Sequence, residues 1–135
     1  MANTRYRRSL IFISLLMALF SLSNAYAQDK TIVVRIARLQ IDSAQLENYK
    51  AALKEHAETA VQVEPGVLTL YAVYEKNNPT HVTVFEIYAN REAYQAHLQT
   101  AHFIKYKTST KNMVKSLELI ETVPIALETK YKNSN

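Results

Sequence analysis

The stretch EIYANREAYQAHLQTAHF, residues 86–103, decides how the rest of this chain is interpreted. It leaves a predicted strand through a polar corner at Asn90 and forms a short helix that carries His97. That helix stops at Thr100, and a second helix begins with His102. Imidazole titrates near physiological pH, so two imidazoles beside an apolar wall can accept or deliver protons. Two ordinary half-buried histidines would show the same spacing, and only geometry separates the two interpretations.

The first 27 residues have the pattern of a secretory signal. Three arginines within the first eight residues precede an apolar run over residues 10–22, and the A-x-A signature of a cleavage site follows at residues 25–27. The apolar run is shorter than the roughly 20 residues of a membrane span, although an uncleaved anchor is the alternative. We expect cleavage after Ala27, which leaves a periplasmic or secreted domain over residues 28–135 with no membrane segment.

The composition excludes several classes of function. The chain has 135 residues, one glycine and no cysteine, which fits a single domain without disulfides. It therefore lacks glycine-rich nucleotide loops, iron–sulfur clusters and thiolate zinc sites. The formal net charge of +4 falls to +1 without the three arginines of the signal, and Lys107, Lys111 and Lys115 fit a solvated helix face. We expect no nucleic-acid partner and no cofactor.

The mature chain alternates between strand and helix patterns. Asp42 and Gln45 are typical of a helix start after a β-branched run. The periodicity predicts a strand over 32–41, a helix over 43–61, strands over 67–75 and 81–89 joined by a five-residue loop, helices capped by Asn90 and Thr100, and a strand over 116–123. This order predicts an α+β fold of the ferredoxin-like βαββαβ type, an antiparallel sheet with helices on one face.

Three residues within this pattern need separate interpretation. Gly66 is the only glycine, so we expect a positive φ or a close approach there. His56 lies on the apolar stripe of the first helix, where a histidine is usually part of the core. Glu86 lies on a strand that is covered on both sides, and we expect it to form a structural ion pair rather than to act as a catalyst.

The strands are apolar on both faces, whereas the predicted helices cover only one. A second copy of the chain is the simplest cover for the other face of a small sheet. The sequence therefore predicts a homodimer in which two sheets face each other.

The chain resembles the antibiotic biosynthesis monooxygenase (ABM) family, including its quinol monooxygenase-like members. The resemblance rests on Glu64-Pro65-Gly66 before the second strand, on Glu86 and Tyr88, and above all on AHLQT-x-HF over residues 96–103. It covers about residues 31–123. Ala101 stands where members often have proline, and Tyr88 stands where tryptophan is also common. A secretion signal is a further departure from the family pattern.

This resemblance implies a dimeric α+β barrel with a small-molecule cavity between sheet and helices. It implies a cofactor-independent monooxygenase that acts on a small electron-rich aromatic compound, such as a quinol or phenol. Two alternatives remain on the same scaffold: a non-catalytic periplasmic module for small-molecule binding or stress response, and a haem-handling protein.

If this oxygen chemistry occurs, the substrate supplies the electrons and the protein supplies a dry pocket, a base and a donor for the oxyanion. The candidate base is His97, or His102 if the helix break turns it inward. The other candidates would line the pocket or stabilise an anion: Tyr74, Tyr88, Tyr94, Phe85, and Arg35 or Arg38. The two histidines are five residues apart, about 140° around a continuous helix, so we expect no metal site.

Overall fold

The computed structural model describes residues 31–130 of the chain. The predicted signal and its cleavage site lie outside these residues. Within the described part, no helix is both long enough and apolar enough to cross a membrane.

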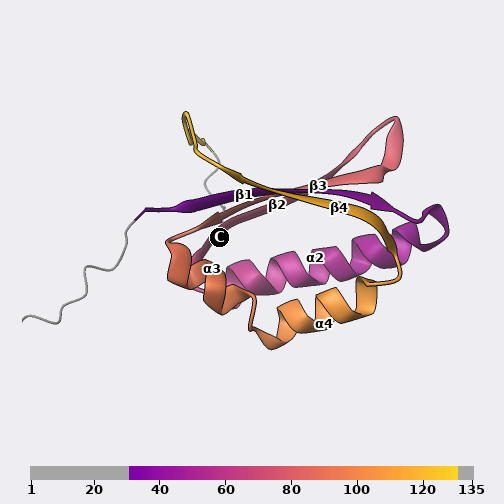
Figure 1. The fold of residues 1–135 in the computed structure, drawn as a ribbon, viewed down its shortest axis with the longest axis horizontal. Helices are drawn as coiled ribbons and strands as arrows, with labels where there is room; N and C mark the ends of the chain where they lie inside the picture. The colour runs from indigo at the N-terminus through magenta and orange to yellow at the C-terminus, as the bar shows by residue number, and fades with distance from the viewer. Residues whose placement is uncertain (1–30, 131–135) are drawn as a thin grey trace, which may run out of the picture.

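A four-stranded antiparallel sheet forms one layer of the fold, in the order β2-β3-β1-β4 (Figure 1). Its strands are β1 (Val33–Ile41), β2 (Val67–Glu75), β3 (Asn78–Tyr88) and β4 (Val114–Thr122). The central strand β1 pairs with β3 on one side and with β4 on the other. The predicted ferredoxin-like α+β fold is confirmed.

The helices form the second layer, and all of them lie on one face of the sheet (Figure 1). A 3-10 turn, η1 (Ser43–Gln45), leads into α2 (Leu46–Val63), and the pair α3 (Arg91–His97) and α4 (Ala101–Thr110) follows the third strand. The apolar stripe of α2 is buried as predicted, with Tyr49, Leu53, His56 and Ala60 on the side that faces the sheet and α4.

The predicted helix break after α3 has a clear cause in its capping groups. The Asn90 side chain accepts a hydrogen bond from the backbone N–H of Ala93 at 2.8 Å and starts α3. The Thr100 hydroxyl accepts from the N–H of Phe103 at 3.3 Å, starting α4, and donates to the His97 carbonyl at 2.8 Å. One threonine therefore ends the first helix and begins the second.

The predicted five-residue loop between the second and third strands is wrong. Glu75 pairs with Asn78, which leaves a two-residue turn, and β3 begins at Asn78 rather than at His81. Pro79 is tolerated in the strand because the pairing of β3 with β1 extends only as far as His81. The missing N–H of the proline therefore costs no hydrogen bond to the central strand.

Gly66 is required by a close approach and not by its backbone angle. No glycine in the described residues has a positive φ. A Cβ atom built on Gly66 would lie 2.5 Å from the Cβ of Ala93, far inside van der Waals contact. The segment after α2 therefore packs directly against α3, and the second of the two predicted explanations is confirmed.

Candidate active site

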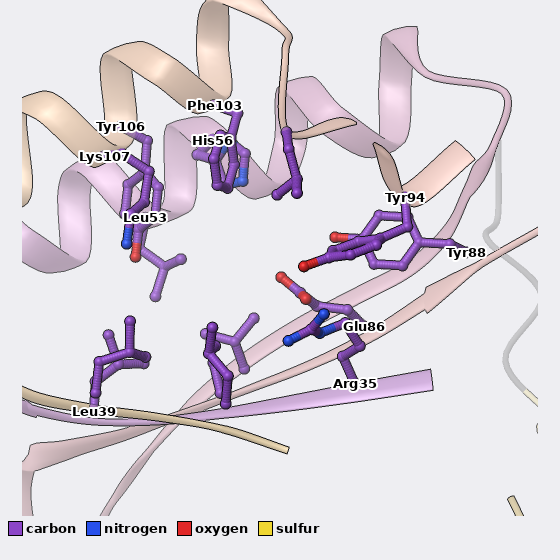
Figure 2. A pocket seen from close by; sticks show the side chains of 15 residues that line it. Arg35, Leu39, Leu53, His56, Glu86, Tyr88, Tyr94, Phe103, Tyr106 and Lys107 are labelled. Carbon is purple, nitrogen blue, oxygen red and sulfur yellow. The ribbon is translucent and has the colours of Figure 1, made fainter. Parts of the chain in front are cut away.

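A cavity of about 90 Å³ lies between the sheet and the helices (Figure 2). Leu117 and Leu119 on the edge strand β4 are 41% and 56% exposed, so the cavity opens beside this strand. Both layers contribute to its apolar wall, which consists of Ala37, Leu39, Leu53, Val84, Leu98, Phe103, Leu117 and Leu119.

Charged and hydroxyl groups gather on the sheet side of the cavity. Arg35 on β1 and Glu86 on β3 are direct cross-strand neighbours, and Figure 2 shows the Glu86 carboxylate turned toward the cavity. Tyr94 packs over Arg35, whose guanidinium carbon lies 4.5 Å from the centre of the ring. Burial raises the pKa of Glu86, and a hydrogen bond with Tyr88 and the charge of Arg35 offset this only in part. Glu86 is therefore a stronger proton acceptor than an exposed carboxylate.

The helix side of the cavity carries an imidazole, that of His56. Its ring stacks on Tyr106 with a centroid distance of 4.8 Å and an interplanar angle of 7°. The Tyr106 hydroxyl is 2.7 Å from the Tyr49 hydroxyl, which fixes the ring beneath His56. Burial lowers the pKa of His56 to about 4, and the neighbouring His97 and His102 add to this effect. His56 is therefore neutral at physiological pH.

A second group of titratable side chains lies behind His56, around the carboxylate of Glu64 at the C-terminal end of α2. Glu64 Oε1 is 2.8 Å from His97 Nδ1, which donates to it, and 2.8 Å from His102 Nε2. The second contact does not have hydrogen-bond geometry, so it is a close electrostatic contact. His102 Nδ1 lies 3.1 Å from His56 Nδ1. We call these four residues the imidazole cluster.

The structure separates the candidate residues into two groups. Arg35 and Tyr88 on the sheet and Tyr94 on α3 line the same cavity. The proposed bases do not line it: His97 is buried behind it at 1% exposure, and His102 lines a smaller neighbouring cavity of about 30 Å³. The burial of His97 lowers its pKa, although Glu64 counteracts the shift.

Three other candidates point elsewhere. Phe85 is one residue from Glu86 and therefore faces the opposite side of the sheet. Tyr74 lies on the helix side of β2 but over the far end of α2, where Lys50 Nζ is 4.0 Å from the centre of its ring. Arg38 is exposed and pairs with Glu118 at 3.6 Å.

The sequence interpretation did not place two of the cavity residues, Glu86 and His56, in the candidate site. Strand alternation already placed Glu86 on the same side as Tyr88, and pairing with β1 places Arg35 opposite it. The pairing register was the missing information, because it decides which charged side chains share a row. For His56, no sequence signal distinguishes a core imidazole from one that also lines a cavity.

No group of histidine and carboxylate side chains within residues 31–130 is arranged to hold a metal ion. In the imidazole cluster, the ring nitrogens approach each other and the carboxylate directly, at hydrogen-bonding distances.

The ferredoxin-like α+β fold of this chain is shared with solved structures. A family model for antibiotic biosynthesis monooxygenase matches residues 32–109. A crystal structure from Bacteroides thetaiotaomicron, titled "Putative antibiotic biosynthesis monooxygenase", is 50% identical, with a TM-score of 0.72 over 76% of this chain and 97% of that one. The chain belongs to the antibiotic biosynthesis monooxygenase family.

Two other solved structures extend the comparison. A protein from Lactobacillus acidophilus, titled "putative monooxygenase", is 30% identical with a TM-score of 0.68, and the alignment covers 71% of this chain but only 46% of that one. A structure from Nitrosomonas europaea is 20% identical with a TM-score of 0.66 over 70% of this chain and 99% of that one, which shows the shared fold alone. No functionally curated protein matches the sequence. The family and these relatives support a monooxygenase-like function.

Proposed function

We propose that the protein is a cofactor-independent monooxygenase acting on a small electron-rich aromatic compound, such as a phenol or quinol. The observation that carries this proposal is the cross-strand placement of Glu86 beside Arg35 in the wall of a mainly apolar and aromatic cavity, which Lys107 also lines. A carboxylate with a raised pKa accepts the hydroxyl proton of a phenol, and the guanidinium stabilises the phenolate that results. The cavity is smaller than the roughly 300–1,000 Å³ of drug-sized ligand sites, which favours a one-ring substrate.

The proposed reaction needs no electron donor other than the substrate. The hydroxyl proton passes to Glu86, the phenolate transfers electrons to O₂, and a C–O bond forms at a ring carbon ortho or para to the hydroxyl that carries a hydrogen. The terminal peroxide oxygen takes up the proton that Glu86 accepted. Loss of the C–H proton at the same ring carbon then breaks the O–O bond, forms a carbonyl group and releases hydroxide, which takes up that proton as water. The phenol becomes a quinone, and O₂ becomes one carbonyl oxygen and one water.

Two proton acceptors on opposite sides of the cavity suit this sequence. Glu86 on the sheet side serves the hydroxyl group, and His56 on the helix side serves the C–H bond that is lost last. His56 takes this role instead of His97, because His56 lines the cavity and His97 does not.

Oxygen consumption with a panel of phenols, hydroquinones and anthrols tests the proposal. We expect uptake with at least one compound, one ¹⁸O atom from ¹⁸O₂ in the product, and about a hundredfold lower kcat in Glu86→Gln. Glu118→Gln, which removes an exposed carboxylate from β4, is the matched control and should retain activity. Ligand binding in the cavity without any oxygen uptake would instead support the non-catalytic binding module.

A further inference from the structure

The imidazole cluster links the C-terminal end of α2, the end of α3 and the first turn of α4. Glu64 and His97 are almost enclosed, with side-chain exposures of 12% and 1%. His56 belongs to the walls of both the candidate active-site cavity and its smaller neighbour, and His102 only to the smaller one. The cluster is therefore a continuous row of polar groups from Glu64 to the cavity.

We propose that Glu64 fixes the tautomers of the three imidazoles in this row, so that His56 presents an unprotonated Nε2 to the cavity. Glu64 and His102 are then positioning residues, because neither lines the cavity itself.

The carboxylate determines the first step, since an ionised carboxylate can only accept hydrogen bonds. His97 must carry its proton on Nδ1, which donates to Glu64 Oε1 at 2.8 Å. The same oxygen lies 2.8 Å from His102 Nε2. Although this contact lacks hydrogen-bond geometry, a protonated Nε2 brings a partial positive charge next to the carboxylate and an unprotonated one brings a partial negative charge, so His102 carries its proton on Nε2 as well.

The second step follows from the contact between two imidazoles. A neutral His102 with its proton on Nε2 has an unprotonated Nδ1, which can only accept. The contact of 3.1 Å to His56 Nδ1 is then satisfied only if His56 donates from Nδ1. A neutral His56 keeps no proton on its other nitrogen. Its burial and the two neighbouring imidazoles favour this neutral form.

The charged side chains at the rim of the smaller cavity pair with each other and not with these imidazoles. At the rim of the smaller cavity, Glu55 on α2 and Lys105 on α4 form an ion pair with each other. Tyr106 contacts His56 through the face of its ring, and its hydroxyl is engaged by Tyr49. Glu55 therefore provides a control carboxylate on the same helix.

The catalytic consequence rests on the proposed function. Removal of the C–H proton requires an acceptor, and His56 is one only when Nε2 is free of a proton. Glu64 thus acts through His102 to keep His56 ready as a base on the helix side of the cavity, although Glu64 itself does not touch the substrate.

Histidine tautomers in the folded protein can be measured by two-bond ¹H–¹⁵N NMR at pH 8, above the ordinary pKa range of imidazole. We expect the proton on Nδ1 in His56 and His97 and on Nε2 in His102. In Glu64→Gln, the His56 and His102 signals should move toward a mixture of tautomers, whereas Glu55→Gln should leave them unchanged. On an identified substrate, Glu64→Gln should lower kcat about tenfold or more with little change in KM.

A wild-type His56 with its proton on Nε2 would overturn the inference, and this measurement needs no variant to fold. Unchanged His56 and His102 signals in a folded Glu64→Gln protein would also overturn it. If the expected tautomers are found but no compound consumes oxygen, the inference stands and the monooxygenase proposal fails.

Discussion

At the scale of single residues, the buried charge of Glu86 is needed for the proposed activity but lowers the stability of the fold. Because burial raises its pKa above the ordinary value of 4.5, the folded chain binds more protons than the unfolded chain just above that pH. The free energy of unfolding contributed by this group therefore falls as the pH rises through that window. We expect Glu86→Gln to raise the Tm by a few degrees at pH 7 and to leave it unchanged near pH 4.

Thermal unfolding at both pH values, followed by circular dichroism, measures this effect. A Glu86→Gln protein that is less stable than the wild type at pH 7 would show that the charge of Glu86 stabilises the fold, as the ion pair expected from the sequence would.

His56 gives the opposite dependence on pH. Its pKa falls from 6.5 to about 4 on folding, so the unfolded chain binds the extra proton between these values. Stability is therefore fully present above about pH 6.5 and decreases as the pH falls toward 4, by on the order of 3 kcal/mol for this one group.

Urea unfolding between pH 4 and pH 7.5 tests the contribution of His56. In His56→Phe, which keeps a ring against Tyr106, we expect a clearly smaller loss of stability on acidification. Equal slopes for His56→Phe and the wild type would contradict the assignment.

At the scale of secondary-structure elements, the contact of Gly66 with Ala93 sets the distance between the end of α2 and α3. Gly66→Ala places two methyl groups 2.5 Å apart, and one of the two segments has to move. We expect a loss of about 1–3 kcal/mol in the free energy of unfolding, as for other overpacked sites. In the double variant Gly66→Ala/Ala93→Gly, which removes the opposing methyl group, part of this loss should return.

Chemical denaturation of the four proteins in this double-mutant cycle gives the coupling energy. Strictly additive effects would mean that the two positions do not share a contact. Because Glu64 lies two residues before Gly66, the His97–Glu64 distance should also change in Gly66→Ala.

The elements themselves could be predicted from the sequence, since strand alternation, the stripe on α2 and the caps at Asn90 and Thr100 are local signals. The hairpin turn could not be predicted, because the register that brings Glu75 opposite Asn78 depends on how β2 pairs with β3. The site shows the same division. Strand alternation places Tyr88 on the same side as Glu86, whereas the positions of His97 and His102 depend on how α3 and α4 pack against Glu64.

At the scale of the whole molecule, the sheet face opposite the helices carries an apolar row across all four strands. Tyr71, Phe85, Ile36 and Ile120 are successive cross-strand neighbours in this row. No helix in the described residues covers this face (Figure 1), and Tyr71 is 60% exposed. Leu127 from the C-terminal segment reaches only one side of it, beside Tyr71, Phe85 and Ile87. An apolar surface of this kind marks an interface, and we propose a homodimer that buries it.

The variant Tyr71→Glu tests the dimer because it places a charge in the middle of that row at a position that is exposed in the monomer. Burying an unpaired carboxylate in an interface is costly, so we expect the dissociation constant to rise by about thirtyfold or more, equivalent to about 2 kcal/mol. Tyr74→Glu is a matched control, since Tyr74 is 52% exposed on the same strand but faces the helix side.

Light scattering after size-exclusion chromatography should find a dimer for the wild type and Tyr74→Glu and a monomer for Tyr71→Glu. A wild-type monomer at micromolar concentration would refute the dimer and leave the apolar row in contact with solvent. A dimer that resists Tyr71→Glu would instead place the interface on another surface.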